Sequence, residues 1–350
     1  MKEKLLKIIY DHFPDFNNNN NNWQNVLDNC SIVPSFLYLQ SMIEYYVSYY
    51  DKNDAINLSF VLYNNKEPVG VMPLIVSKND KQEWVLSSNG TEIIEPLFRK
   101  SLAPKVKKRL EKELQYLILD ITKQLDIRKC QFVNVNLLNV SNWYLMWAKM
   151  AKEVFSTHHI FVNLSLSLQD IHLKFRKSFK PLVNKGLREW KVEVHEKVSN
   201  ELFDSFRLFH KSEAGRVTRS NESWQIQKKQ INSGESFLVL VKSKEDSLVG
   251  GGLFTYSRDK GFYSVGVYKR ELNNTPLGHI VQMKAIETLK KNNVLWYEIG
   301  QKYLEIDRRK PNKKELLISH FMEGFASDII ARQNLIVNLS HDKSIDNQLI

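Results

Sequence analysis

The sequence has few cysteines and no long apolar run, and each scarcity excludes a class of protein. Two cysteines, Cys30 and Cys130, among 350 residues cannot supply a disulfide framework or a cysteine-rich metal cluster. We therefore expect reduced thiols and no metal site. No uninterrupted apolar stretch approaches the roughly 18 to 20 residues that span a bilayer. The N-terminal segment also lacks the apolar core and cleavage site of a secretory signal, so the expected location is the cytoplasm.

The composition is typical of a folded protein with an excess of positive charge. Hydrophobic residues make up 43% of the chain, aromatic residues 11% and charged residues 25%, which indicates a large buried core rather than disorder. A chain of 350 residues exceeds the usual size of one domain, so we expect two. The formal net charge of +11 favours anionic partners such as nucleic acid, phosphorylated carriers or an acidic membrane face, although solubility alone accounts for it equally well.

One order of elements occurs twice along the chain. Residues 58–76 and 83–88 have the pattern of strand, polar turn, strand, turn and strand, and residues 236–256 and 261–269 repeat it. In each half a proline-containing loop, an amphipathic helix and a closing strand follow. The expected helices are 106–124 and 277–291, and the expected closing strands are 130–137 and 294–300. The matched order predicts a duplicated α/β unit with mixed sheets, not a doubly wound parallel sheet, because the hairpins come first.

The predicted domain boundaries follow from composition. A short helix from Lys4 to Phe13 and a loop at the six asparagines 17–22 precede the main fold, since a low-complexity polar run cannot bury a core. The predicted domains are 1–22 as N-terminal helix and asparagine-rich loop, 23–165 as the first unit, 166–195 as a basic amphipathic linker helix, and 196–350 as the second unit with a C-terminal extension.

The linker concentrates positive charge. Residues 174–191 contain seven Lys or Arg and one acid, and their apolar positions form one helical stripe. Pro181 is awkward inside a helix, so we expect a new helix to begin there with Ser178 near its cap. A solvated basic face explains this pattern as well as a platform for a phosphate-bearing ligand does. On the second interpretation, Lys180 and Lys185 bind the substrate.

The loop from Asn273 to His279 precedes the second predicted helix. In acetyltransferases of the GNAT type, an Arg/Gln-x-x-Gly-x-Gly/Ala turn at this position presents backbone amides to the pyrophosphate of coenzyme A. This loop has one glycine, Gly278, and Pro276 removes an amide donor. The coenzyme A cradle is therefore missing. Walker motifs, dinucleotide fingerprints, zinc spacings and Gly-x-Ser-x-Gly elbows are also absent from the sequence.

A duplicated GNAT-like unit without this cradle resembles the FemAB-like transferases over about residues 23–330. The stretches that carry the resemblance are 165–194 (the linker), 209–227 (a helix and loop with paired arginines), 273–300 (the second loop, helix and strand) and 314–326 (a Phe-x-x-Gly-Phe motif). The resemblance implies a tandem GNAT-like fold. The family includes enzymes that move an amino acid from aminoacyl-tRNA onto peptidoglycan precursors, and relatives in bacterial polysaccharide or cell-envelope assembly.

One position departs from the pattern of the aminoacyl-tRNA users. Their C-terminal motif typically reads Phe-Lys-x-Gly-Phe, whereas this chain has Met322 in place of the lysine. The methionine favours the branch associated with envelope polysaccharides. The resemblance thus implies acyl or aminoacyl transfer, aligned and direct, to an amino or hydroxyl group of a sugar, sugar nucleotide or lipid-linked envelope precursor.

The resemblance leaves the donor open between an acyl-CoA and an aminoacyl-tRNA, with no permanently bound cofactor. The expected substrate partner is a phosphorylated sugar or a lipid-linked precursor. Further expected partners are a tRNA and the inner face of the membrane, which the protein would contact peripherally. Two alternatives stay open. One is an acyl-CoA-dependent N-acetyltransferase with an altered pocket. The other is a non-enzymatic RNA-binding protein, although the sequence has no RNP-type aromatic motif.

Aligned transfer requires positioning, stabilisation of the developing oxyanion and removal of a proton. Arg216 and Arg219 stand in a glycine-containing loop shortly before Trp224, and arginine forks suit phosphate or carboxylate groups. The resemblance implies that this segment lines the acceptor groove. His279, at the expected helix start, and Glu298, near a strand end, are the candidate catalytic groups. A helix cap or packing residue explains His279 equally well, and a salt bridge explains Glu298.

Other candidates are weaker. The further candidate substrate-binding residues are Gln282, one turn after the histidine, and Tyr303 and Asp307 in the loop after the closing strand. We expect Lys313, Glu315 and His320 near the C-terminal motif to form a wall of the site. The Val249–Gly252 run predicts either a β-bulge or a strand that a ligand approaches closely.

Overall fold

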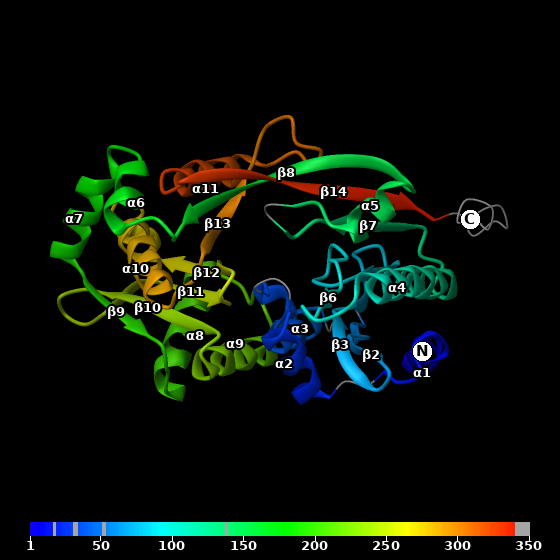
Figure 1. The fold of residues 1–350 in the computed structure, drawn as a ribbon. Helices are drawn as coiled ribbons and strands as arrows, with labels where there is room; N and C mark the ends of the chain where they lie inside the picture. Colours follow the sequence, from blue (N-terminus) through cyan, green and yellow to red (C-terminus); the bar gives the residue numbers. More distant parts are fainter. Residues whose placement is uncertain (17–18, 31–33, 51–53, 137–138, 340–350) are drawn as a thin grey trace. The chain divides into compact units, whose positions relative to one another are not determined.

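The computed structural model describes residues 1–16, 19–30, 34–50, 54–136 and 139–339. The chain forms two units. The first contains the residues up to Ser156 together with the described residues from Arg332 onward, and the second spans Thr157–Ala331. Both boundaries fall inside long strands, β8 (Ala151–Asn163) and β14 (Asp328–Asn338) (Figure 1). The described residues 332–339 therefore belong to the first unit, whereas the prediction from the sequence placed them in the second.

In the first unit, helices and two small sheets contribute to one core. The sheets have the strand orders β2-β3-β6 and β1-β4-β5. Their strands are β1 (Ile56–Asn57), β2 (Phe60–Asn64), β3 (Glu67–Met72), β4 (Ile75–Lys78), β5 (Trp84–Ser87) and β6 (Leu97–Phe98). The helices are α1 (Lys2–His12), α2 (Asn20–Asp28), α3 (Gln40–Tyr49), α4 (Pro104–Gln124) and α5 (Asn142–Ala148), with the 3-10 turn η1 (Phe36–Tyr38). Strand β7 (Lys129–Val133) pairs antiparallel with the end of β14.

The predicted helix at 106–124 is confirmed as α4. Proline at position 104 occupies the first turn, where its missing N–H costs no helical bond. Leucine and isoleucine recur every three or four residues and form one buried stripe, namely Leu110, Leu114, Leu117, Ile118 and Ile121. The stripe shares a core with Phe132 and Trp147, whose rings stack at 4.1 Å between centroids. Packing of this apolar face, more than helix propensity, stabilises α4.

The described part of the asparagine run, residues 19–22, is a helix start rather than a loop. The Asn19 side chain accepts hydrogen bonds from the backbone N–H groups of Asn21 and Asn22, which makes it the N-cap of α2. Residues 20–22 form the first turn of that helix. The polarity of the run alone predicts a loop, but asparagine is also a favoured capping residue. Asn17 and Asn18 lie outside the described residues.

The second unit is built on a mixed sheet of order β8-β13-β12-β11-β10-β9. Its strands after β8 are β9 (Lys191–His195), β10 (Ser236–Lys242), β11 (Leu248–Tyr256), β12 (Lys260–Tyr268) and β13 (Trp296–Lys302). Its helices are α6 (Leu168–Lys174), α7 (Phe179–Glu189), α8 (Asn200–Ala214), α9 (Asn221–Ser233), α10 (Leu277–Lys291) and α11 (Lys313–Glu323), with the 3-10 turn η3 (Arg270–Leu272). The strands and helix predicted between residues 236 and 300 are confirmed.

The two faces of this sheet carry different helices. Along β10, Phe237 and Val239 pack in a core with α10, whereas Leu238 and Leu240 pack in a second core with α8 and α9. Alternate residues of a strand project to opposite faces, so this uninterrupted apolar strand serves both cores. Helix α10 therefore covers one face, and α8 and α9 cover the other.

The predicted single linker helix is instead α6, α7 and the edge strand β9, all within the second unit. Ser178 is the N-cap of α7 and Pro181 lies in its first turn, which confirms the predicted helix start. Phe175 ends α6 in an extended conformation and interrupts the helical stripe. Of the predicted apolar stripe, Leu187 remains 41% exposed.

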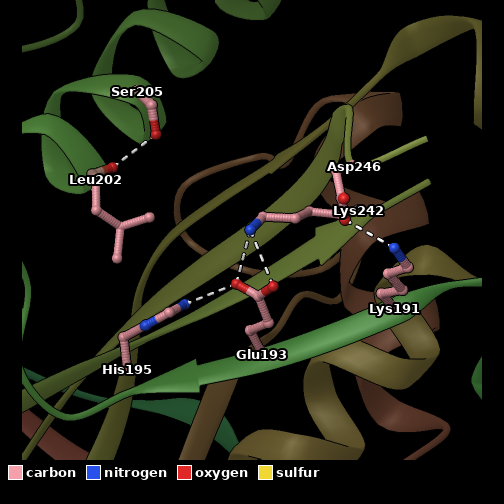
Figure 2. Close-up of polar contacts among 7 residues, drawn as sticks. All are labelled: Lys191, Glu193, His195, Leu202, Ser205, Lys242 and Asp246. Carbon is pink, nitrogen blue, oxygen red and sulfur yellow. Dashed lines mark hydrogen bonds and ion pairs between the residues drawn. The ribbon is translucent and has the colours of Figure 1, made fainter. Parts of the chain in front are cut away.

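Strand β9 forms the sheet edge and carries a network of charged side chains (Figure 2). Glu193 accepts hydrogen bonds from Lys242 Nζ at 2.9 Å and from His195 Nε2 at 3.1 Å, and Lys191 binds Asp246 at 2.8 Å. The Lys242 bond is the main cause that lowers the pKa of the Glu193 carboxyl. Charged side chains on an edge strand oppose pairing with other chains.

Two irregularities shape the sheet near its centre. Val249 is an extra residue in β11 opposite β10, so the predicted β-bulge is confirmed there. The close approach at Gly251 is made by the protein itself, because a Cβ there would lie 2.7 Å from the Val239 carbonyl oxygen. Strands β12 and β13 run parallel and pair over only three residues before they separate.

Among the described residues, no helix is long and apolar enough to cross a bilayer.

Candidate functional site

A glycine and a helix cap shape the loop between α8 and α9. After α8, Gly215 takes a left-handed conformation with φ of +67°, and its N–H bonds back to the carbonyls of Lys211 and Ser212. Helix α9 then begins after Ser220, whose hydroxyl accepts a hydrogen bond from the Ser223 N–H. The chain therefore reverses within residues 215–220, and the two loop arginines come to lie beside both helices.

A basic pocket lies at this reversal. It holds about 380 Å³ of empty space, part of which is open to solvent. Four cationic side chains line it, namely Arg207 and Lys211 of α8 and Arg216 and Arg219 of the loop. The other lining residues are Leu208, His210, Val217, Thr218, Asn221 and Trp224, so no Asp or Glu contributes. A concave site with one sign of charge attracts anionic groups.

Arg219 is held in this pocket without a full set of partners. Its guanidinium carbon lies 4.7 Å from the centroid of the buried Trp224 ring. Its Nε and Nη1 atoms are buried and have no hydrogen-bond partner among the described residues, and the same holds for the Thr218 hydroxyl. Buried donors without acceptors cost free energy. An anion in the pocket would satisfy them.

The remaining polar groups set the charge and shape of the pocket. Arg207 is fixed because its Nε donates to Asp204 at 3.0 Å and its Nη1 donates to Asn221 at 2.9 Å. Burial, with a smaller contribution from Arg219, lowers the pKa of His210 to about 4. His210 is therefore neutral near pH 7, and the positive charge comes from the arginines and Lys211.

The structure brings Arg216, Arg219 and Trp224 into one pocket, as expected for residues that bind a common ligand. Their role in binding stays a prediction. Arg207 and Lys211 of α8 were not among the residues predicted from the sequence. These two residues are four positions apart and share one helical face, and this spacing, directly before the arginine loop, is a signal that could have found them.

His279 packs among aromatic rings at the start of α10. The ring centroids of Phe179 and Phe321 lie 4.5 and 5.0 Å from its own. Burial first, and then the charge of Arg176, lower the pKa of His279 to about 4. Its Nε2 is buried and has no hydrogen-bond partner among the described residues. The imidazole is thus a neutral packing residue in this structure, and its catalytic role stays a prediction.

Aromatic side chains also cover the position of the missing coenzyme A cradle. A Cβ on Gly278, the single loop glycine, would lie 3.0 Å from the Phe321 ring. Phe321 and Phe325 belong to the C-terminal motif and pack against Phe179 of α7. The Arg176 N–H donates to the Gly324 carbonyl at 2.8 Å. The Phe-x-x-Gly-Phe motif therefore joins α7 to α10.

The candidate residues Glu298 and Gln282 are both buried, on opposite sides of the sheet. Glu298 is 4% exposed, with Lys260 Nζ at 3.2 Å and His159 Nδ1 at 2.7 Å from its carboxylate oxygens. Gln282 accepts a hydrogen bond from the Tyr297 hydroxyl within the core under α10. The salt-bridge interpretation of Glu298 is confirmed. His159 and Lys260 were not predicted from the sequence because they lie on other strands.

The loop after β13 is organised by its own hydrogen bonds. Asp307 accepts a hydrogen bond from the Leu304 N–H at 2.9 Å, and the Arg309 guanidinium lies 5.3 Å from the centre of the Tyr303 ring. Glu315 completes a capping box with Asn312 at the start of α11. Asp307 and Glu315 thus have structural roles. The predicted contribution of the loop, with the nearby Lys313 and His320, to ligand binding stays a prediction.

The two lysines of the basic helix are exposed. Lys180 lies in the first turn of α7, and Lys185 forms a 3.8 Å ion pair with Glu189 one turn further along. Neither lines the basic pocket. Exposed pairs of this kind contribute little to stability, so a solvated basic face accounts for them. A substrate-binding role stays a prediction.

Comparison with known proteins identifies the fold. No family model and no curated protein sequence matches this chain. The structure of FemX matches 92% of this chain and 97% of its own, with a TM-score of 0.66 and 12% sequence identity. L-PGS from Bacillus licheniformis matches 95% of both chains, with a TM-score of 0.60 and 10% identity. The C-terminal domain (DUF2156) of a proposed lysylphosphatidylglycerol synthetase from Agrobacterium fabrum also covers 95% of both, with a TM-score of 0.58 and 11% identity. The chain therefore has the FemAB-like tandem GNAT fold over nearly its full length.

Proposed function

We propose that this protein transfers an acyl or aminoacyl group directly to an amino or hydroxyl group of a phosphate-bearing envelope precursor. The acceptor is a sugar, a sugar nucleotide or a lipid-linked intermediate. The observation that carries the proposal is the basic pocket between α8 and α9, which presents four cationic side chains and no acidic one. Two buried nitrogen donors of Arg219 have no hydrogen-bond acceptor there among the described residues. Arginine forks bind phosphate oxygens through paired hydrogen bonds.

The matched structures support the reaction class. One carries the name FemX, and another is named for lysylphosphatidylglycerol synthesis, which joins an aminoacyl group to a phospholipid. A phospholipid, a sugar nucleotide and a lipid-linked sugar share a phosphodiester or diphosphate group next to the accepting end. A pocket for that phosphate would align the acceptor, and alignment alone can supply a large part of the rate enhancement in such transfers.

The packing around α10 favours a donor other than an acyl-CoA. Pro276 supplies no N–H at the start of that helix, and the Phe321 ring lies against Gly278. A pyrophosphate bound in the GNAT manner would need to displace the ring and would find fewer backbone donors. Met322, at the position of the family lysine, is 8% exposed and packs in the core with α10. The proposal therefore leaves an aminoacyl-tRNA or another activated acyl donor.

A reconstitution assay tests the proposal. The protein is incubated with acetyl-CoA or lysyl-tRNA as donor, and with UDP-N-acetylglucosamine or phosphatidylglycerol vesicles as acceptor, and the products are identified by mass spectrometry. We expect one acceptor to gain one lysyl mass from lysyl-tRNA, and the Arg216→Ala/Arg219→Ala variant to lose the product. Product formation from acetyl-CoA alone would favour the N-acetyltransferase alternative. Salt-sensitive RNA binding without turnover would favour the RNA-binding alternative and contradict the proposal.

A further inference from the structure

A hydrogen-bonded series of polar side chains crosses the sheet of the second unit, on the face opposite α10. Thr157 Oγ1 lies 3.0 Å from His159 Nε2, and His159 Nδ1 lies 2.7 Å from Oε1 of Glu298. The other carboxylate oxygen lies 3.2 Å from Lys260 Nζ. The order is therefore hydroxyl, imidazole, carboxylate and ammonium. Three neighbouring strands, β8, β13 and β12, supply these groups.

Glu298 lies on the same face of the sheet as His159, because its partner Phe161 is two residues from His159 along β8, and a bulge in β13 follows directly after it. Gln301 pairs with His159, whereas Glu298 pairs with Phe161, so three residues of β13 oppose two of β8. In a regular ladder, residues three apart project to opposite faces. The extra residue, Ile299, allows Glu298 and Gln301 to share the face of His159. Bulges of this kind are frequent next to active sites because they redirect a side chain.

Exposure increases along the series. The exposed fraction of the side chain is 1% for Lys260, 6% for Glu298 and 13% for His159, and Thr157 is partly exposed. The buried ammonium stabilises the ionised carboxylate beside it. A carboxylate accepts a hydrogen bond from imidazole Nδ1–H, and in that tautomer of a neutral imidazole Nε2 carries the lone pair that can accept the hydroxyl proton. The more exposed end of the series is therefore a hydroxyl within hydrogen-bond distance of an imidazole nitrogen.

We infer that the Thr157 hydroxyl is an activated nucleophile that captures an acyl group from an activated ester. His159 accepts the proton, and Glu298 is the positioning residue that fixes the imidazole tautomer. This order of groups is the one that activates hydroxyl nucleophiles in general. The inference concerns an acyl group held on the protein, and it stands independently of the direct transfer proposed above.

The atoms of the step balance with a simple acyl donor. With p-nitrophenyl acetate, the bond between the acetyl carbon and the phenolic oxygen breaks, and a bond between Thr157 Oγ1 and that carbon forms. The hydroxyl proton moves to His159 Nε2, and p-nitrophenolate leaves with the electron pair. The imidazolium then releases its proton to water. The product is an acetyl ester on Thr157, with no change in oxidation state.

The test uses p-nitrophenyl acetate on the full chain, with release of p-nitrophenolate and peptide mass spectrometry as readouts. We expect an acetyl group on Thr157 that hydroxylamine removes, since hydroxylamine cleaves esters and leaves lysine amides intact. Thr157→Val should abolish this ester and slow the initial release at least about tenfold, whereas Thr157→Ser should retain both. Thr275→Val is the matched control, because the Thr275 hydroxyl donates to the Leu272 carbonyl and not to an imidazole.

Two further variants test the roles of the supporting groups. His159→Gln removes the base, and Glu298→Gln combined with Lys260→Met removes the carboxylate without leaving a buried ammonium unpaired. Each variant should slow acetylation of Thr157 at least about tenfold. The midpoint of unfolding is measured for each variant, to identify those that stay folded. An absence of ester on wild-type Thr157, or equal labelling in Thr157→Val, would overturn the inference. Equal acetylation rates in the folded supporting variants would overturn the assigned roles. The donor is artificial, so neither result depends on the proposed natural reaction.

Discussion

The guanidinium of Arg219 stacks on the ring of Trp224, with 4.7 Å between the guanidinium carbon and the ring centroid. Trp224 is itself held edge-on by Phe203 and Phe206 of α8, at 6.0 and 6.2 Å between centroids. A cation over a largely desolvated indole contributes about 1 to 2 kcal/mol. The core of the unit therefore sets the position of the charge before any ligand binds. Such preorganisation lowers the entropy cost of binding.

Folding stability should depend on pH through His279. Its pKa is lowered to about 4 in the folded chain from an ordinary value of 6.5, by burial and then by Arg176. The unfolded chain binds the proton at a higher pH, so stability is lost as pH falls from about 6.5 toward 4. We expect the free energy of unfolding, from urea titrations at about pH 7 and about pH 5, to fall less in His279→Gln than in the wild type. His320→Gln, at a side chain 69% exposed, should leave the difference unchanged. Identical pH slopes in His279→Gln and the wild type would contradict the assignment.

Gly324→Ala should destabilise the second unit. A Cβ at this position would overlap the Phe179 ring, which packs against both phenylalanines of the C-terminal motif. Overpacking of this kind costs about 1 to 3 kcal/mol. Gly300→Ala is the control, because its added Cβ would meet Met322 Cγ at an ordinary 3.6 Å. Thermal or urea unfolding measures both. Equal midpoints for the two variants would show that the motif is not tightly packed.

Asn19→Ala should weaken the start of α2. The substitution removes the acceptor for the backbone N–H groups of Asn21 and Asn22, and loss of such a cap costs about 1 kcal/mol. Asn21→Ala keeps the cap, since only the backbone of that residue takes part. Chemical denaturation followed by circular dichroism compares the two. A loss in Asn21→Ala as large as in Asn19→Ala would mean that the cap contributes nothing.

The sequence predicted those features that are local in the chain. Apolar runs separated by polar turns predicted β10, β11 and β12, and the apolar stripe predicted α4, because each pattern is local in the chain. The arginine loop was found for the same reason, since residues 216, 219 and 224 are close in sequence. Capping by Asn19 was also local, but the compositional bias of the asparagine run obscured it.

The features that the sequence did not predict depend on contacts between distant residues. His159 and Glu298 are 139 residues apart, and the antiparallel pairing of β8 with β13 brings them together. Strand β14 returns to the first unit because Leu335 and Val337 complete its core, a pairing that periodicity alone does not reveal. The coverage of Gly278 by Phe321 likewise depends on where α11 docks.

Affinity for pyrophosphate tests the basic pocket most directly, since sugar nucleotides and lipid-linked sugars share that group. Isothermal titration calorimetry compares the wild type with two single variants of the pocket, Arg216→Ala and Arg219→Ala. The control is Arg188→Ala, because Arg188 is an exposed arginine of α7 that does not line the pocket. We predict that each pocket variant loses at least about tenfold in affinity, or about 1.4 kcal/mol, while Arg188→Ala binds as the wild type does. Unchanged affinity in both pocket variants, or no binding of pyrophosphate to the wild type, would contradict the proposal that this pocket holds the phosphate of the acceptor.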